Sequence, residues 1–453
     1  MRKMILQCGV LALSLLAANV MAAVSPEEAA KLGTSLTPVG AEKAGNADGS
    51  IPAWTGGLPK NAGAVDSKGF LADPFASEKP LFVITAATVD KYKDKLSDGQ
   101  VAMFKRYPET YKIPVYPSHR TVNLPPDIYE SIKRSALNVH AINDGNGLEN
   151  FTGNRYYAFP IPKNGVEVLW NHITRYHGGN LRRIITQATP QTNGSYTPIR
   201  FEEEVAVPQA IPDIDAAKAA NVLSFFKQSV TAPARLAGNV LLVHETLDQV
   251  KEPRLAWIYN AGQRRVRRAP QVSYDGPGTA SDGLRTTDNF DMFSGAPDRY
   301  DWKLVGKKEM YVPYNDYKLV YGSKADQMLT PKHINPDVVR WELHRVWVVE
   351  ATLQPGKRHI YSKRVFYLDE DSWTALASDE YDARGQLYRS AFLYPVQNYD
   401  VSTPYTFTHG FYDFNSNLYT LDVNVAETGG VIYKPVLPDR EWGPDALAGS
   451  GVR

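Results

Sequence analysis

The sequence predicts a mainly β protein of the α+β class, built on a large curved antiparallel sheet, or incomplete barrel, that helices cover. Three observations predict this fold. The composition is globular, with 43% hydrophobic and 22% charged residues, which excludes a disordered chain. The second half of the chain alternates apolar and polar residues with the period of a strand. Helical patterns are few and lie in the first half, between stretches rich in Gly and Pro.

Residues 1–22 have the three parts of a secretory signal peptide. Arg2-Lys3 forms a positive start, Met4–Ala18 is an apolar run, and Val20-Met21-Ala22 supplies small or apolar residues at a cleavage site. The apolar run is too short to span a membrane. We therefore expect cleavage near Ala22 and a location in the periplasm of a Gram-negative bacterium.

The only cysteine of the chain, Cys8, lies in this segment, so the mature chain has none. This excludes thiol catalysis, iron–sulfur clusters and cysteine-based zinc sites. The charges nearly balance, with 50 Lys and Arg against 49 Asp and Glu, whereas a general nucleic-acid-binding protein needs a surplus of cations. We expect no cofactor and no nucleic-acid partner.

Residues 23–125 form the predicted N-terminal region, which is rich in Gly and Pro and carries a short helix. The pattern predicts that helix over Thr88–Tyr107, with a break at Asp98-Gly99. A second helix is expected from Pro125 to about Leu137. A third is expected over Ile214–Val230, an Ala-rich stretch with buried apolar residues.

Successive strands are predicted from about residue 233 to residue 425. The clearest is Val339–Ala351, in which Arg340, Glu342 and His344 share the face opposite to the apolar one. We expect that polar face to be solvated or joined in salt bridges. Together with Arg358–Leu368 the segment predicts a long hairpin. Further strands are expected at Arg254–Asn260, Arg264–Ala269, 373–381, 387–395, 405–413 and 417–424.

The predicted division places one β-rich domain at residues 126–442 and a flexible tail at residues 443–453. The apolar face of the strands suits a concave cavity for an acyl chain or another hydrophobe. The alternative is an ordinary filled core, which periodicity alone does not separate from a cavity. The predicted cavity residues are Trp257, Tyr259, Trp341, Leu343, Trp347, Ile360 and Phe366.

Four arginines cluster around Val266 on the second strand of a predicted hairpin: Arg264, Arg265, Arg267 and Arg268. Such a cluster suits an anionic lipid headgroup, a phosphate or an acidic partner protein. The alternative is a solvated strand whose charges pair with acids on its neighbour.

Other motifs are incomplete. His244-Glu245-Thr246-Leu247-Asp248 begins like a zinc-protease motif but ends on aspartate, where that motif requires histidine. His172 and His177 flank Arg175, yet their spacing does not place them on one helical face. Gly276–Ser281 begins like a dinucleotide loop but lacks the third glycine. We predict no metal site and no catalytic residue.

Five long stretches are typical of one family: Ala44–Gly57, Phe159–Gly165, Trp170–His172, Gly262–Pro270 and Gly295–Trp302. On these stretches the chain resembles, over nearly all of its mature length, the Gram-negative periplasmic family catalogued as domain of unknown function 1329. One residue departs from the pattern, Ala158, where proline is expected.

The resemblance implies a fold similar to that of the LolA and LolB lipoprotein carriers, an incomplete antiparallel barrel with a concave apolar face. Those carriers bind the acyl chains of lipoproteins. Members of the family are often encoded near an outer-membrane barrel protein and an RND-type exporter, which implies a hydrophobic cargo handled between the membranes. The family has no established catalytic residues, so none is carried over.

Three functions stay open on the sequence. The first is a periplasmic carrier of a lipid or another hydrophobe, in peripheral contact with a membrane. The second is an adaptor without a small ligand, which assembles with the barrel protein or the exporter through the N-terminal half. The third is an envelope hydrolase, which requires a cleft that gathers His172, His177 or His244 with an acid and a serine.

Overall fold

One open sheet of 16 strands organises the molecule. The computed structural model describes residues 24–451, except 152, 154, 406, 424–428 and 434–436. The predicted signal segment, 1–22, lies outside the described residues. The strands pair antiparallel, except where β2 meets β12. In sheet order they are β1 (Phe82–Ile84), β2 (Ile113–Val115), β12 (Trp341–Leu353), β13 (Lys363–Asp369), β14 (Ala375–Tyr381), β15 (Leu387–Leu393), β18 (His409–Asp413), β19 (Leu418–Val423), β5 (Leu181–Ala188), β6 (Ile199–Ala206), β7 (Val222–Ala232), β8 (Val240–Thr246), β9 (Leu255–Asn260) and β10 (Arg265–Arg268), with β11 (Tyr300–Pro313) beside β12 and β20 (Ile432–Tyr433) beside β5.

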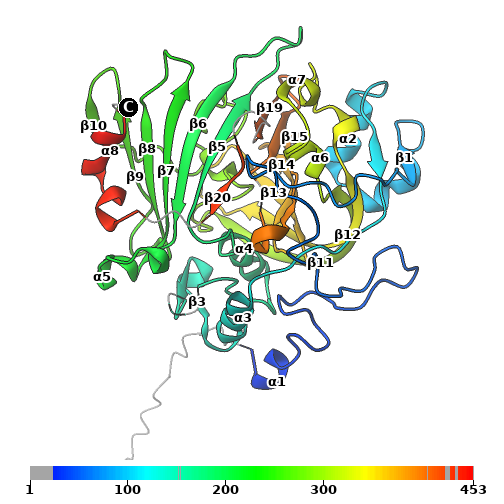
Figure 1. Cartoon of the computed structure of the whole chain (residues 1–453), viewed down its shortest axis with the longest axis horizontal. Helices are drawn as coiled ribbons and strands as arrows, with labels where there is room; N and C mark the ends of the chain where they lie inside the picture. The colour runs from blue at the N-terminus through cyan, green and yellow to red at the C-terminus, as the bar shows by residue number, and fades with distance from the viewer. Residues whose placement is uncertain are drawn as a thin grey trace, which may run out of the picture.

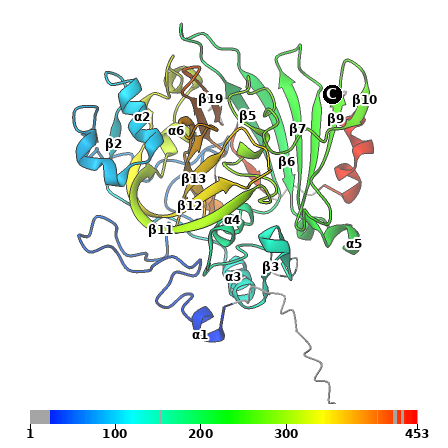
Figure 2. The same ribbon diagram turned by 180° about the vertical axis from the view of Figure 1, so that it is seen from behind.

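Short helices lie around this sheet (Figures 1 and 2). The α-helices are α1 (Pro26–Ala29), α2 (Asp98–Arg106), α3 (Pro126–Asn138), α4 (Gly165–Ile173), α5 (Ala216–Ala219), α6 (Tyr317–Val320), α7 (Ala325–Met328) and α8 (Leu447–Ser450). The 3-10 helices are η1 (Val89–Lys95), η2 (Asn143–Gly145), η3 (Pro208–Ala210), η4 (Thr287–Asn289), η5 (Pro336–Val338), η6 (Tyr399–Val401), η7 (Asp439–Trp442) and η8 (Pro444–Ala446). Two strand pairs lie off the sheet, β3 (His140–Ile142) with β4 (Gly147–Glu149) and β16 (Gln397–Asn398) with β17 (Thr403–Pro404). The predicted fold class is confirmed.

The sheet has two walls that β18 and β19 join. In Figure 1 the β5–β10 wall is the green row of long strands, with α8 beside its outermost strands. The β11–β15 wall is drawn in yellow to orange on the other side of the view, and Figure 2 shows the strong curvature of β11 in this wall. The helix α4 contacts β11 and β12.

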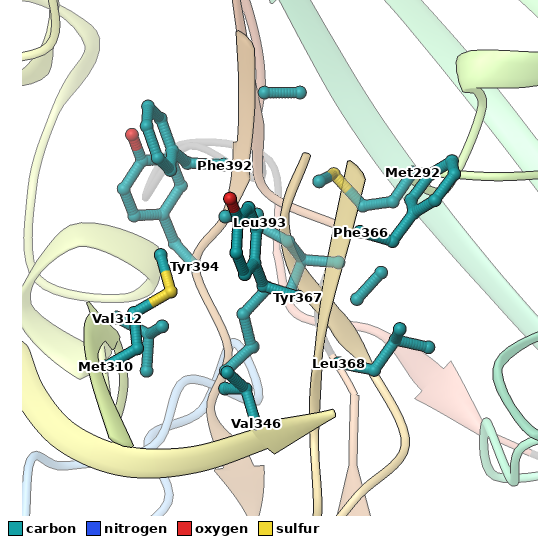
Figure 3. Close-up of a cluster of buried hydrophobic side chains, with 14 of the residues drawn as sticks. Met292, Met310, Val312, Val346, Phe366, Tyr367, Leu368, Phe392, Leu393 and Tyr394 are labelled. Atoms are coloured by element: carbon teal, nitrogen blue, oxygen red, sulfur yellow. The ribbon is translucent and has the colours of Figure 1, made fainter. Parts of the chain in front are cut away.

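The β11–β15 wall encloses a large filled core. Figure 3 shows Met310 and Val346, with Phe366, Leu368 and Phe392, among the buried side chains that fill it. The predicted apolar face of β12 takes part in this core, which also includes residues of the N-terminal region. Close packing of this kind leaves no space for a ligand at those positions.

The polar face of β12 is not solvated but buried, joined in salt bridges beneath the N-terminal region. Glu342 is fully buried. Its Oε1 accepts a hydrogen bond from Arg340 Nε at 2.6 Å, and its Oε2 lies 2.9 Å from His344 Nε2. Although burial acts to raise its pKa, His344 and Arg340 lower the pKa of Glu342. Nearby, Arg120 holds Asp371 with two hydrogen bonds of 2.8 and 2.7 Å. The salt bridges predicted as one alternative are therefore present, in a buried setting.

The first two predicted helices form as expected. The break lies at Leu96-Ser97, between η1 and α2, two residues before the predicted Asp98-Gly99, which begin α2; Ser97 caps α2 in a capping box with Gln100. A Cβ atom on Gly99 would collide with Ser390 and Asp379, so glycine lets the first turn of α2 pack closely against β14 and β15. The second helix is α3.

The predicted third helix, Ile214–Val230, is wrong. Only α5 is helical there, capped by Asp215, and the chain then enters β7. Hydrogen-bonding partners on both sides, β6 and β8, favour a strand for this Phe- and Val-containing segment over the helical preference of its alanines.

The strand predictions hold for the second half but begin too late in the chain. The two hairpins form as β9–β10 and β12–β13, and β14, β15, β18 and β19 lie within the other predicted segments. The sheet already starts its β5–β10 wall at Leu181. The predicted flexible tail, 443–453, also differs, because Leu447 is buried against the β5–β10 wall; residues 452 and 453 lie outside the described part.

Candidate functional site

A cavity of about 170 Å³ lies against the inner face of the β5–β10 wall. Its walls are mostly apolar. Strand residues form one side of it, and the loop between β10 and β11 forms another. The apolar residues that line it include Leu181, Val205, Phe226, Leu241, Val243, Phe290 and Phe293.

Strand periodicity decides which side chains reach the cavity. On β8, Leu241, Val243 and Glu245 line it, whereas Leu242 packs in a separate cluster on the opposite face. His244 also points to that face, where its Nε2 lies 2.7 Å from the carbonyl oxygen of Trp442. The segment that resembled a zinc-protease motif is therefore a strand with its histidine outside the cavity.

The structure places two predicted cavity residues on the outer face of the wall. Tyr259 is buried, and Trp257 is partly buried, in the cluster that includes Trp442 and Leu447. Their register explains this position, because Tyr259 pairs with Val240 and Trp257 with Leu242, and paired residues share a face.

The other five predicted cavity residues also lie away from the cavity. Trp341, Leu343 and Phe366 are buried in the filled core of the β11–β15 wall, and Trp347 packs partly buried against it. Trp347 stacks on Trp373 with the ring centroids 5.9 Å apart. Ile360 precedes β13 instead of belonging to it, and it is 41% exposed. None of the seven predicted residues is among the described residues that line this cavity.

The predicted basic cluster is exposed at the edge of the sheet. Arg265, Arg267 and Arg268 lie on β10, the last strand, and Arg264 occupies the turn before it with φ +51°. Arg268 lies over the ring of Trp257 at 4.8 Å. Basic residues on an edge strand discourage pairing with other chains. The cluster is not part of the cavity lining.

Charged side chains line the cavity together with the apolar ones. Five arginines are among the lining residues of the described chain, against two carboxylates, those of Glu245 and Asp291. Arg254 pairs with Glu245 at 2.6 Å, and Arg175 pairs with Asp291 at 2.6 Å. The five arginines are Arg155, Arg175, Arg183, Arg254 and Arg285.

Two of the three histidines that the sequence offered for a hydrolase, His172 and His177, lie beside Asp291. His172 lies with Nε2 2.7 Å from the carbonyl oxygen of Asp291, and its Nδ1 accepts from the backbone N–H of Ala375. One donor and one acceptor nitrogen define a neutral ring. Burial, together with the charge of Arg175, lowers the pKa of His172 to about 3.

His177 and His409 complete the group around Asp291. Each has its Nε2 3.6 Å from a carboxylate oxygen of Asp291. Desolvation and the charge of Arg175 lower the pKa of His177 to about 4. In the described part of the chain no serine hydroxyl hydrogen-bonds His172, His177 or His409, so the group is an ion-pair cluster at the cavity wall.

The glycine-rich segment Gly276–Ser281 has a structural role that its motif did not predict. Pro277, Gly278 and Thr279 line the cavity. A Cβ atom on Gly278 would lie 2.6 Å from Nη1 of Arg285, so glycine permits a close approach of the backbone to that guanidinium. The Gly–Pro pattern was the one signal in the sequence that marked this loop.

A possible metal-ligand group lies elsewhere, among buried residues of the β11–β15 wall. Within the described residues, potential ligand atoms of His344, Asp369 and Asp371 lie within 4.8 Å of one another. Arg120 already binds both oxygens of Asp371, and Tyr314 donates to Asp369 at 3.0 Å. These partners fit a structural network better than a metal centre. Separately, none of the described helices is long and apolar enough to span a membrane.

Comparison with known proteins places the chain among relatives without a described activity. It is 61% identical to an uncharacterised protein of Pseudomonas aeruginosa, over 100% of this chain and 99% of that one. Among solved structures it is similar to a lipoprotein-sorting protein domain of Vibrio parahaemolyticus, at 14% identity, with a TM-score of 0.44 over 63% of this chain and 98% of that one. A LolA superfamily protein of Nitrosomonas europaea aligns at 12% identity, with a TM-score of 0.37 over 63% and 100%.

A member of one family also appears among these solved structures. A DUF1329 family protein of Desulfovibrio piger aligns at 14% identity, with a TM-score of 0.41 over 60% of this chain and 92% of that one. The model of that family, described as protein of unknown function DUF1329, matches residues 83–448. The chain belongs to the DUF1329 family.

Proposed function

We propose that the protein binds an apolar chain of a lipid or a related hydrophobe in this cavity and carries it through the periplasm. The observation that carries the proposal is the cavity of about 170 Å³ with mostly apolar walls. Protein interiors are otherwise close-packed, and an apolar space of this kind is suited to an apolar ligand.

The volume limits the ligand that fits. A cavity of about 150 Å³ holds benzene, so roughly six carbon atoms of one chain fit here. Burial of six methylenes contributes roughly 5 kcal/mol. That corresponds to a Kd of about a millimolar or somewhat below, before the cost of ordering the ligand. Polar contacts must therefore supply the rest of a tight complex.

The setting we propose is transfer of this cargo between the two membranes, in association with an outer-membrane barrel protein and an RND-type exporter. The signal-like sequence of residues 1–22 supports export. The family resemblance supports the two partners. Contact with a membrane surface would be peripheral in this scheme.

The two other functions have less support. An adaptor without a ligand requires a large exposed apolar patch and no cavity, and the cavity counts against it. A hydrolase requires a nucleophile beside its base, but the described histidines around Asp291 contact Asp291, Arg175, aromatic rings and backbone groups.

A cavity-filling variant tests the proposal. Val243→Phe places extra volume in the cavity, and Val305→Phe makes the same change at a strand residue that is 56% exposed. In an NMR titration with 1-hexanol we expect the wild type and Val305→Phe to bind at about millimolar concentration, and Val243→Phe to bind at least about ten-fold more weakly. Equal binding by all three proteins would refute the cavity as the site.

A further inference from the structure

Buried arginine Nε atoms without hydrogen-bond partners concentrate at the cavity. Among the described residues, four arginines have a buried Nε with no partner, namely Arg175, Arg254, Arg285 and Arg364. The first three line the cavity. Buried donors are normally satisfied, and those that are not call for an explanation. A missing ligand is one explanation that also accounts for the cavity.

Arg285 is the least satisfied of the three. Arg254 also donates to Ser294 at 2.7 Å, and Arg175 donates to the carbonyl oxygen of His172 at 2.7 Å. For Arg285 the nearest carboxylate oxygen belongs to Asp422 and lies 3.7 Å from Nε, beyond hydrogen-bond distance. In the described chain the guanidinium of Arg285 donates no hydrogen bond, although its residue is only 4% exposed.

The counter-ion of Arg285, the carboxylate of Asp422, is distant and costly to keep charged. Burial raises the pKa of Asp422 despite the nearby charge of Arg285, and its Oδ1 has no hydrogen-bond partner. The other cavity arginines have closer carboxylates: Arg175 has Asp291, and Arg254 has Glu245. The lining therefore holds one guanidinium whose nearest carboxylate, that of Asp422, forms only a loose ion pair with it at 3.7 Å.

Packing holds this guanidinium in place without using its hydrogen bonds. The backbone of Gly278 donates to the carbonyl oxygen of Arg285 at 3.0 Å and leaves no room for a Cβ beside Nη1. The ring of Phe290 lies 5.8 Å from the guanidinium carbon and 5.0 Å from the ring of Phe226. Phe226 and Phe290 also line the cavity, so the guanidinium of Arg285 adjoins apolar surface.

We propose that the cavity selects a single-chain amphiphile with an acidic headgroup, and that Arg285 receives the headgroup while the apolar walls hold the start of the chain. A guanidinium binds carboxylate and phosphate oxygens through paired hydrogen bonds. The volume of about 170 Å³ admits one chain and not two. The inference rests on the proposed function and deepens it by naming the ligand class.

Four ligands with the same six-carbon chain test the inference: hexanoate, hexyl phosphate, 1-hexanol and hexylamine. The readout is the Kd of each for the full mature protein by NMR titration. We expect the better of the two anions to bind about 10- to 100-fold more tightly than 1-hexanol, and hexylamine to bind more weakly than the alcohol. Tighter hexanoate binding identifies a fatty-acid-like ligand, and tighter hexyl phosphate binding identifies a phosphate headgroup.

Two arginine variants separate the site from general charge. Arg285→Gln is expected to bring the ratio of anion to alcohol affinity close to one, and Arg285→Lys to restore part of it. Arg265→Gln removes a charge from exposed β10 and is expected to keep the wild-type ratio.

The outcomes separate failure of the inference from failure of the proposed function. If anion and alcohol bind the wild type equally, or if Arg265→Gln lowers the ratio as much as Arg285→Gln does, the inference is refuted and the carrier proposal stands. If none of the four ligands binds the folded wild type, the proposed function itself fails.

Discussion

Two buried arginines, Arg345 on β12 and Arg285 in the loop between β10 and β11, have opposite surroundings. In the β11–β15 wall, Arg345 donates to Glu370 at 2.6 Å and to the carbonyl oxygen of Ala44 at 2.7 Å. In the loop between β10 and β11, Arg285 reaches no hydrogen-bond acceptor in the described chain, and its nearest carboxylate oxygen, on Asp422, lies 3.7 Å from Nε. Arg345 fastens the N-terminal region to a filled core, whereas Arg285 lines the cavity.

This difference separates the part of the molecule in which buried charges stabilise the fold from the part in which a buried charge is available to a ligand. Satisfied buried charges act within the fold, whereas an unsatisfied one keeps its binding capacity for a ligand. Arg364, on β13, is a partial exception in the filled wall, because its Nε lacks a partner although its Nη1 donates to Asp288 at 3.0 Å. Its guanidinium lies 5.2 Å from the ring of Phe293, which lines the cavity, so even this exception adjoins the cavity.

The largest expected effect comes from removing one buried arginine of the N-terminal region, Arg120, and comparing the result with removal of Arg285 at the cavity. Arg120→Met leaves Asp371 buried without its two hydrogen bonds, and we expect a loss of about 3–5 kcal/mol in the free energy of unfolding. Arg285→Met removes a guanidinium that donates no hydrogen bond in the described chain and that lies 3.7 Å from Asp422 in a loose ion pair, so we expect a smaller loss of about 1–2 kcal/mol. Urea unfolding measures both. Equal losses of unfolding free energy in the two variants would mean that Arg285 stabilises the fold as much as Arg120 does.

Matched leucine truncations sharpen the same comparison. Leu368 is 1% exposed in the filled core, and Leu368→Ala is expected to cost about 3–4 kcal/mol. Leu241 already borders empty space and loses fewer contacts, so Leu241→Ala is expected to cost about 1–2 kcal/mol. A cost at Leu241 as large as that at Leu368 would mean that the cavity wall is packed like the core.

Stability at low pH tests the contacts of His172 on α4. Its ring hydrogen-bonds Asp291 in the loop between β10 and β11 and the backbone of Ala375 on β14. Its folded-state pKa of about 3 lies below the ordinary 6.5, so the unfolded chain takes up the proton first. Its stabilising contribution is complete above pH 6.5 and falls by about 1.4 kcal/mol per pH unit between pH 6.5 and 3.

The difference between wild type and His172→Gln isolates this contribution, because other titrating groups are common to both. Glutamine can supply both a donor and an acceptor in place of the ring. We expect the variant to show a shallower loss of unfolding free energy between pH 6.5 and pH 4.5. Parallel pH profiles would contradict a neutral, buried His172.

The smallest effect is expected at the exposed basic strand. Arg267→Glu on β10 changes a solvated side chain, and we expect the free energy of unfolding to stay within about 0.5 kcal/mol. The Kd for 1-hexanol is expected to stay unchanged as well. A clear loss of ligand binding in this variant would make β10 part of the site.

The sequence predicts much of the fold because strand periodicity is a local signal. The hairpins β9–β10 and β12–β13 follow from alternation and turn residues. The strand β6 escaped notice because it carries three consecutive glutamates, whose partners lie on neighbouring strands: Glu203 pairs with Arg183 and Glu204 with Lys227. Such pairing is a tertiary fact that one strand does not reveal.

The site was less predictable for a related reason. Alternation identifies a buried face but does not say whether that face meets other side chains or empty space. Trp341 and Phe366 therefore read as cavity residues and proved to be core. Arg285 carries no local signal, because its neighbours are set by the tertiary fold. Its nearest carboxylate, that of Asp422, lies on β19, more than 130 residues along the chain.

Native mass spectrometry of the protein purified from its own periplasm, followed by solvent extraction, tests the central claim most directly. Our account predicts a bound single-chain acidic amphiphile that solvent releases and that is absent from Val243→Phe but present in Val305→Phe. A clean apo mass for the wild type, under conditions that preserve a known lipid-carrier complex, would contradict the carrier function.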